Sequence, residues 1–136
     1  DPQTRHDRMA GIRKRDTSPV LRVRRALHAA GLRFRLHRRD LPGTPDVVLP
    51  SRRVAILIHG CFWHQHPGCR LARRPKANQA YWEPKLARNV TRDEATHGAL
   101  IALGWLVIVV WECETRCQDS LHQLVDALRP LPSRQA

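Results

Sequence analysis

The sequence lacks any apolar run long enough to cross a membrane. Its longest run, from Trp105 to Trp111, has the length of a β-strand, whereas a membrane helix needs about 20 apolar residues. The opening residues 1–8 also lack the apolar core of a secretory signal peptide. A membrane span is therefore excluded, and we expect a cytoplasmic protein whose thiols are reduced.

Acidic residues are scarce as well. Asp and Glu number 12 against 24 Lys and Arg, which gives a formal net charge of +12 spread along the whole chain. A positive field of this kind favours a polyanion, and nucleic acid above all. The alternative is a charge that serves only solubility, so the composition indicates a nucleic-acid partner without establishing one.

Internal repeats are absent too, and 136 residues suffice for one compact domain with a core. We expect a basic, partly flexible arm over 1–16, a single domain over 17–130 and a polar tail over 131–136. Within the domain, hydrophobic periodicity and Gly/Pro signals predict seven elements. These are a helix over 18–30, strands over 33–37, 46–49 and 54–58, a helix over 79–103, a central strand over 105–111 and a helix over 120–128.

The connection over 50–52 is short enough to make the second and third strands a hairpin, which brings Asp46 close to Ile58 and His59. Strands of mixed direction flanked by helices predict an α/β fold with a mixed sheet. The order of elements also resembles the core of restriction-endonuclease-like nucleases, although likeness of fold is by itself a weak guide to function.

One short segment, from Cys61 to Cys69, combines metal ligands with aromatic rings. Candidate ligands in and beyond this segment are Cys61, His64, His66, Cys69, Cys113 and Cys117. Zinc takes four such ligands in a tetrahedron, so the chain offers more than a closed site needs. Cys113 follows the apolar strand, and a site that joined it to the segment would link distant parts of the chain. This favours Cys61, His66, Cys69 and Cys113 as a structural zinc site.

Two other interpretations of these residues are less favoured. Ordinary buried cysteines with solvated histidines do not account for two cysteines and two histidines in so short a segment. Disulfides are not expected in a chain without a secretion signal. If His64 stays outside the zinc shell, its neutral imidazole can take a proton from water, as a general base must. Asp46 is the best placed carboxylate for a Mg²⁺ ion, or is only a turn residue after Pro45.

Several motifs resemble the very-short-patch-repair (Vsr) DNA mismatch endonuclease family, over nearly the whole chain from Arg8 to Cys113. They are Leu41 to Asp46 (LPGTPD), His59 to His64 (HGCFWH), Trp82 with Lys85 and Asn89, Gly104-Trp105, and Trp111 to Cys113 (WEC). The resemblance implies a zinc-stabilised, restriction-endonuclease-like fold. It also implies a Mg²⁺-dependent, strand-specific endonuclease that nicks DNA 5′ of the thymine in a T:G mismatch.

The resemblance also assigns roles to individual residues. It places Mg²⁺ on Asp46 and the main-chain carbonyl of Ile58, and the catalytic histidine at His64. His59 and Asp93 are further catalytic candidates, with Asp93 as a partner for metal-bound water or for His59. The zinc ligands it implies are Cys61, His66, Cys69 and Cys113, the same set as above.

The aromatic residues Phe62, Trp63 and Trp82 match the family's rings that wedge into the base stack beside the mismatch. On the predicted long helix, Lys85 and Asn89 lie four residues apart and so share one face, with Trp82 a turn earlier. We therefore expect these three residues to face the DNA together, with the tryptophan exposed. A solvated helix face with one stray tryptophan is the alternative.

The chain departs from the family at Val20, where a glutamate is usual, and by one extra residue between His66 and Cys69. Valine cannot organise the catalytic centre, nor complete a capping box with Thr17. The alternatives to a mismatch endonuclease are therefore a zinc-containing mismatch-binding protein with weakened catalysis, or a nuclease of the same fold in restriction or mobility. The resemblance further implies a monomer of the bacterial cytoplasm and nucleoid, linked to a cytosine-5 DNA methyltransferase and to later repair proteins.

Overall fold

A computed structural model describes residues 17–132. The predicted arm over 1–16 and residues 133–136 of the predicted tail lie outside the described residues. The elements are α2 (Ser18–Ala29), β1 (Arg35–Leu36), β2 (Val47–Leu49), β3 (Val54–His59), α3 (Gln79–Ala102), β4 (Leu106–Trp111), α4 (Glu112–Thr115) and α5 (Gln118–Leu128), with 3₁₀ turns at Pro50–Arg52 and Arg70–Ala72. The predicted order of helices and strands is confirmed, and α4 is an additional short helix.

The four strands form one mixed sheet in the order β1-β2-β3-β4. Antiparallel pairing joins β1 to β2 and β2 to β3, so the predicted hairpin is confirmed. Parallel pairing joins β3 to β4 and sets His59 opposite Trp111. The prediction of a central strand over 105–111 is wrong, because β4 lies at one edge of the described sheet. Residues of β4 are apolar because they pack against both faces of the sheet. The strand has a neighbour, β3, on one side only.

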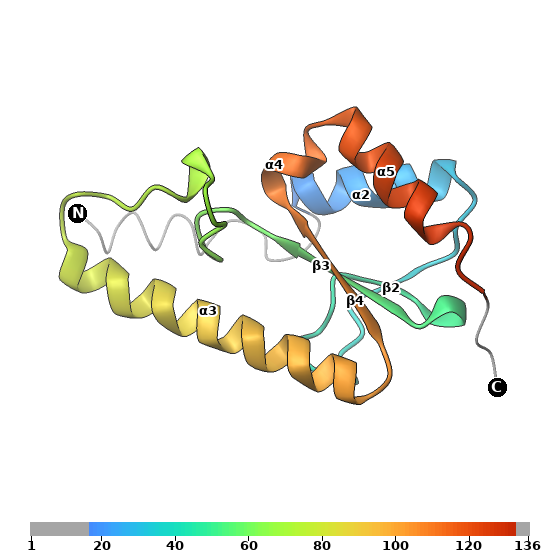
Figure 1. The fold of residues 1–136 in the computed structure, drawn as a ribbon, viewed down its shortest axis with the longest axis horizontal. Helices are drawn as coiled ribbons and strands as arrows, with labels where there is room; N and C mark the ends of the chain where they lie inside the picture. Colours follow the sequence, from blue (N-terminus) through green and yellow to red (C-terminus); the bar gives the residue numbers. More distant parts are fainter. Residues whose placement is uncertain (1–16, 133–136) are drawn as a thin grey trace.

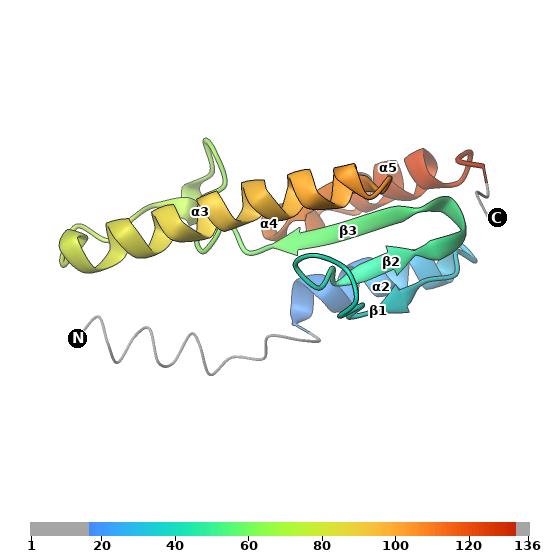
Figure 2. The same ribbon diagram turned by 90° about the horizontal axis from the view of Figure 1, so that it is seen from below.

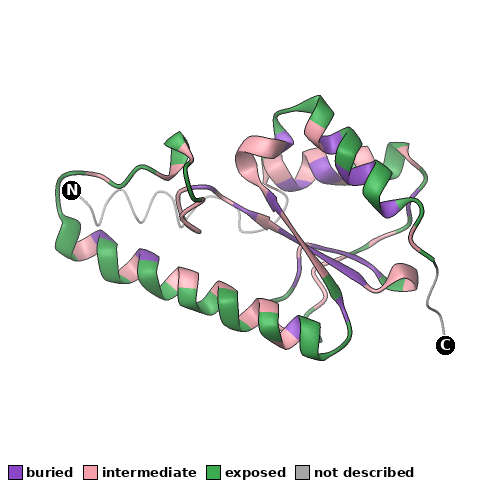
Figure 3. Ribbon diagram, in the orientation of Figure 1, coloured by how far each residue is buried: buried purple, intermediate pink, exposed green. Residues whose placement is uncertain are grey.

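Helices cover both faces of the sheet, which gives three layers (Figures 1 and 2). On one face α2 and α5 pack against Val47, Leu49 and Ile56. On the other face, Leu100 of α3 packs with Val48 and Ala55. Alternate residues of one strand therefore enter different cores, as the two-residue period of a strand requires. The apolar residues of α5, Leu121, Leu124, Val125 and Leu128, are all buried, and the ribbon of this helix alternates between buried and exposed positions in Figure 3.

The first strand is shorter than predicted. Its ladder covers only Arg35 and Leu36, because His37 adopts a left-handed backbone conformation with φ of 51°. A long loop then returns the chain to β2. At Gly43 in this loop φ is 72°, and a methyl group there would overlap the side chain of Thr96 on α3. The loop that leads to Asp46 can therefore lie against α3 only because residue 43 has no side chain.

The N-terminal half of α3 extends beyond the sheet, and the segment that follows β3 lies beside it (Figures 1 and 2). Among the helices of residues 17–132, none combines the length and apolar character that a membrane crossing requires. The end of β3, the segment after it and the projecting part of α3 together frame the candidate site.

Candidate functional site

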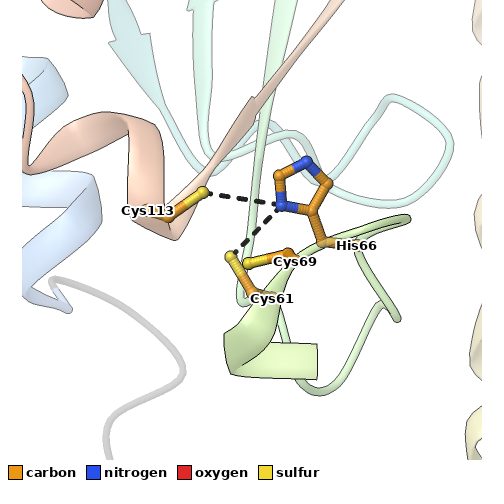
Figure 4. Close-up of side chains that lie close together, drawn as sticks. All are labelled: Cys61, His66, Cys69 and Cys113. Atoms are coloured by element: carbon orange, nitrogen blue, oxygen red, sulfur yellow. Dashed lines mark hydrogen bonds between the residues drawn. The ribbon is translucent and has the colours of Figure 1, made fainter. Parts of the chain in front are cut away.

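The four residues predicted as zinc ligands lie together (Figure 4). Cys61, His66 and Cys69 come from the segment after β3 and Cys113 from α4, and their donor atoms all lie within 4.8 Å of one another. Nδ1 of His66 is 3.6 Å from Sγ of Cys61 and 3.5 Å from Sγ of Cys113. In a zinc tetrahedron with Zn–S of about 2.3 Å and Zn–N of about 2.0 Å, sulfur and nitrogen stand about 3.5 Å apart. The cluster therefore fits a Zn²⁺ ion.

Neighbouring groups hold this cluster in shape. The His66 ring stacks on Trp111, with centroids 4.2 Å apart and planes 9° apart. The amide of Cys61 donates to Oε1 of Glu112 at 3.2 Å. All four cysteines are free thiols, and the exposed Cys117 lies outside the cluster. Burial raises the pKa of the Cys61 thiol to about 12, so its thiolate needs a cation beside it.

We predict that Cys113→Ser removes zinc and destabilises the protein. The wild type should hold one equivalent of zinc by elemental analysis, and the variant far less. With zinc at 1,000 times its Kd, binding stabilises the folded state by about 4 kcal/mol, and the variant should lose that stabilisation in urea unfolding. Cys117→Ser is the matched control and should keep both zinc and stability. Equal zinc content in the two variants would refute the ligand role of Cys113.

A second cluster lies at the end of β3 and joins it to α3. Nδ1 of His64 is 2.6 Å from Oδ2 of Asp93, and the His59 ring stacks on the His64 ring at 4.0 Å. Asp93 was expected to serve metal-bound water or His59, but its side-chain partner in the structure is His64. His64 and Asp93 are only partly buried, with side-chain exposures of 29% and 24%.

This pairing decides which nitrogen of His64 is basic. A carboxylate accepts hydrogen bonds, so Nδ1 of His64 carries the hydrogen donated to Asp93 and Nε2 is left as the acceptor. Burial, followed by the nearby charge of His64, lowers the pKa of His59 to about 4. His59 is therefore a neutral ring at physiological pH, and its buried Nδ1 has no hydrogen-bond partner among the described residues.

Asp46 lies beside the same end of β3, as the predicted hairpin requires. Its Oδ2 accepts a hydrogen bond of 2.8 Å from the amide of Ile58. Burial raises the pKa of Asp46, and the hydrogen bond from the Ile58 amide, followed by electrostatic interaction with the His37 and His64 rings, opposes that rise. The structure thus gathers Asp46, His59, His64 and Asp93 around the end of one strand. His37 was not anticipated there, although the strand register opposite Asp46 could have indicated it.

The aromatic residues form a cluster between α3 and the segment after β3. Trp82 is only 2% exposed, and the rings of Phe62 and Trp63 lie 5.4 and 6.0 Å from it. The expectation of an exposed Trp82 is therefore wrong. Phe62 and Trp63 are themselves half-buried. Trp82 therefore packs against both of these rings while remaining inaccessible to solvent itself.

The other residues expected to face DNA also contact the protein itself. The amide nitrogen of Asn89 donates to the carbonyl of Trp63 at 3.1 Å, and Nζ of Lys85 lies 5.7 Å from the centre of the Tyr81 ring. Gln65, which the sequence did not single out, donates to the carbonyls of Phe62 and Ala72 at 2.7 and 3.1 Å. The Asn89 contact fixes the segment that carries His64 against α3, and the Gln65 contacts hold the two ends of that segment together.

Val20 is buried, and the Thr17 side chain forms no capping hydrogen bond. Both observations agree with the loss expected from valine at this position. The first turn of α2 contains no acidic residue, so position 20 supplies no carboxylate to the site.

Known proteins resemble this chain over most of its length. A family model described as DNA mismatch endonuclease Vsr matches residues 1–70. Type II nicking enzyme V.XorIIP of Xanthomonas oryzae is 52% identical over 113 residues, which cover 83% of this chain and 82% of that protein. DNA mismatch endonuclease Vsr of Escherichia coli is 40% identical over 121 residues, 89% of this chain and 77% of that protein. Type II nicking enzyme V.NmeAIP of Neisseria meningitidis is 36% identical over 125 residues, 89% of each.

Proposed function

Because the chain belongs to the Vsr family of DNA mismatch endonucleases and is a DNA-nicking phosphodiester hydrolase, we propose that it nicks double-stranded DNA 5′ of the thymine in a T:G mismatch. Such mismatches arise when 5-methylcytosine is deaminated. The observation that carries the proposal is the His64–Asp93 pair beside the half-buried carboxylate of Asp46. A base and a metal-binding group next to one another suit hydrolysis of a phosphodiester.

The residues around Asp46 fit a Mg²⁺ ion. One carboxylate oxygen is held by the Ile58 amide, and this leaves Oδ1 to face a cation. Burial raises the pKa of Asp46, so a cation nearby would stabilise its charged form. Oxygen ligands are those that Mg²⁺ prefers, and the Ile58 carbonyl is the second ligand in our proposal. When bound, Mg²⁺ offsets negative charge on the scissile phosphate and on the leaving 3′ oxygen.

His64 acts in this proposal as the general base. Nδ1 donates to Asp93, so Nε2 can take a proton from the attacking water. The Asp93 carboxylate then stabilises the imidazolium that forms. His59, which burial keeps neutral, adds no positive charge beside His64 and holds its ring in place by stacking. The products are a 3′-hydroxyl and a 5′-phosphate.

Phe62 and Trp63 are the rings that we propose to wedge beside the mismatch. Intercalation unstacks bases at a cost of a few kcal/mol, and the cost is smaller beside a mismatch. Since Trp82 is packed against both rings, its own insertion would require the aromatic cluster to open. Lys85 and Asn89, on the same side of α3, would hold the DNA backbone.

A nicking assay tests this function. We expect Mg²⁺-dependent nicking of a T:G duplex, none with chelator, and none of the matched C:G duplex. The flanking sequence should be varied over the sites of cytosine-5 methyltransferases, because the proposal links the enzyme to such a methyltransferase and to later repair proteins. Gel filtration should give the mass of a monomer.

Two outcomes would replace the proposal with another function. Binding without nicking at high enzyme concentration would favour the catalytically weakened mismatch-binding protein, for which Val20 is the evidence. Cleavage of matched DNA would favour a role beside restriction, in keeping with the type II nicking enzymes among the relatives. Nicking that occurs only in T:G duplexes, and only on the strand that carries the thymine, contradicts both of these alternative functions.

A further inference from the structure

Gln65 directly follows the proposed base, His64, and both hydrogens of its side-chain amide are used within the protein. Nε2 donates to the carbonyls of Phe62 and Ala72 at 2.7 and 3.1 Å. Oε1 accepts from Nε of Arg74 at 2.8 Å. Carbonyl oxygens can accept only from the nitrogen of the amide, and the guanidinium can donate only to its oxygen, so these partners fix the orientation of the group.

The backbone of Gln65 is also held in an unusual conformation. Its φ of 51° is left-handed, which is uncommon for a residue with a side chain. Such conformations persist where the surrounding structure fixes them, often at functional sites. Glycine would adopt this conformation more readily, but it would lack the three side-chain hydrogen bonds of the half-buried glutamine.

The two peptide units that lead to His64 are both held by side-chain amides. Gln65 donates to the carbonyl of Phe62, and Asn89 on α3 donates to the next carbonyl, that of Trp63, at 3.1 Å. A carbonyl oxygen lies in the plane of its peptide unit, so these two hydrogen bonds set the backbone orientation on both sides of Trp63. The two rings proposed to wedge into DNA and the imidazole of the base all extend from this stretch of backbone.

Arg74 connects Gln65 to the projecting part of α3. Its Nη1 lies 3.9 Å from Oε1 of Glu83, which belongs to that helix. The two charged side chains are 46% and 57% exposed, and ion pairs between exposed groups contribute little. The two hydrogen bonds that Gln65 donates to backbone carbonyls are therefore the main constraint on the segment.

We propose, on the basis of the function above, that Gln65 is a positioning residue of the nicking site. Its amide holds residues 62–64 in the conformation that presents the two rings to the mismatch and Nε2 of His64 to the attacking water. Without these hydrogen bonds, the segment would have to be ordered each time DNA binds. Misplacement of a reacting group by about 1 Å can lower the rate by about 10²-fold, so an effect on catalysis is expected although Gln65 itself contacts neither the DNA nor the water.

Hydrogen exchange and single-turnover nicking of a T:G duplex, both on the zinc-loaded protein, test this role. In Gln65→Leu the backbone amides of residues 62–66 should exchange about tenfold faster than in the wild type. Nicking at saturating DNA should be roughly 10- to 100-fold slower. Gln123→Leu, which replaces an exposed glutamine on α5, is the matched control and should behave as the wild type in both measurements.

Two further variants separate the hydrogen bonds of Gln65 from one another. Gln65→Glu should be as slow as Gln65→Leu, because an ionised carboxylate can accept from Arg74 but cannot donate to the carbonyls. Arg74→Ala keeps both hydrogen bonds to the carbonyls, and its nicking rate at saturating DNA should stay within about threefold of the wild type.

The outcomes distinguish this inference from the function on which it rests. Wild-type nicking by Gln65→Leu, beside a wild type that nicks the T:G duplex, would overturn the role of Gln65 alone. Slow nicking with a matching loss of zinc would also overturn it, because the side chain would then only support the zinc site. Slow nicking with wild-type exchange would overturn it as well, since the side chain would then act on DNA directly.

Two results remain to be assigned. If the wild type itself does not nick T:G DNA, the proposed function fails and this inference fails with it. If Gln65→Leu unfolds, Gln65→Glu decides: wild-type nicking by a folded Gln65→Glu protein would show that the two hydrogen bonds to the carbonyls are not required, and would overturn the inference.

Discussion

Asp46→Asn is expected to lower the single-turnover rate of nicking by on the order of 10³-fold while leaving the fold intact. Loss of a charge that holds the cation removes several kcal/mol of transition-state stabilisation, and each 1.36 kcal/mol corresponds to about tenfold in rate. The asparagine oxygen can still accept from the Ile58 amide, the bond that Oδ2 of Asp46 makes now. The substitution therefore removes charge and keeps shape.

Stability distinguishes this effect from misfolding. Partial burial raises the pKa of Asp46, which means that its charged form is unfavourable when no cation is bound. Without Mg²⁺, the Tm of Asp46→Asn should therefore equal or exceed that of the wild type, and its affinity for a T:G duplex by fluorescence anisotropy should be retained. Asp40→Asn is the control, since Asp40 is exposed and pairs with Arg38. Wild-type nicking by Asp46→Asn would remove the proposed metal site.

Replacing His64 with alanine should slow nicking by about 10²- to 10⁴-fold, the usual contribution of a general base. Asp93→Asn should cost nearly as much. An asparagine amide can donate to Nδ1 of His64, which would move the hydrogen to Nε2 and leave no basic nitrogen for the water. Asp93→Ala, which lets either tautomer form, should be less damaging than Asp93→Asn. Rates are measured in single turnover with DNA saturated.

The double variant sharpens this expectation. If His64 and Asp93 act as a unit, His64→Ala combined with Asp93→Asn should be no slower than His64→Ala alone. Added imidazole should restore part of the activity of His64→Ala. His122→Ala, an exposed histidine on α5, should nick at the wild-type rate. If His64→Ala also nicks at the wild-type rate, His64 is not the general base.

The sequence predicted the strands and helices well because each has its own local signal. The hairpin through Pro50–Arg52 was enough to bring Asp46 to Ile58. The zinc ligands could also be predicted, because Cys113 joins the Cys61–Cys69 segment to a distant strand and the family resemblance assigns His64 a catalytic role. These inferences depend on periodicity, turn length and ligand chemistry, which can be recognised from residue types and their spacing in the sequence.

Other features depend on how elements pack, which local patterns do not contain. The pairing of His64 with Asp93 is set by the rotation of α3 against the segment after β3. Trp82 was expected to be exposed because Lys85 and Asn89 share its side of the helix. Leu86, four residues later and fully buried, marks the same side as an inner one. The edge position of β4 was hidden because an apolar run is the same for a strand with two neighbours and a strand between two layers of helix.

The close approach of Gly43 to Thr96 limits which substitutions the chain can accept during evolution. A side chain at position 43 would collide with Thr96 and would also have to adopt a φ of 72°. A side chain at position 43 is therefore unfavourable for two reasons, and a smaller residue at position 96 would remove only the collision. Positions 43 and 96, which are far apart in the sequence, therefore constrain each other. Substitutions in the loop before Asp46 depend on which side chain α3 presents to that loop.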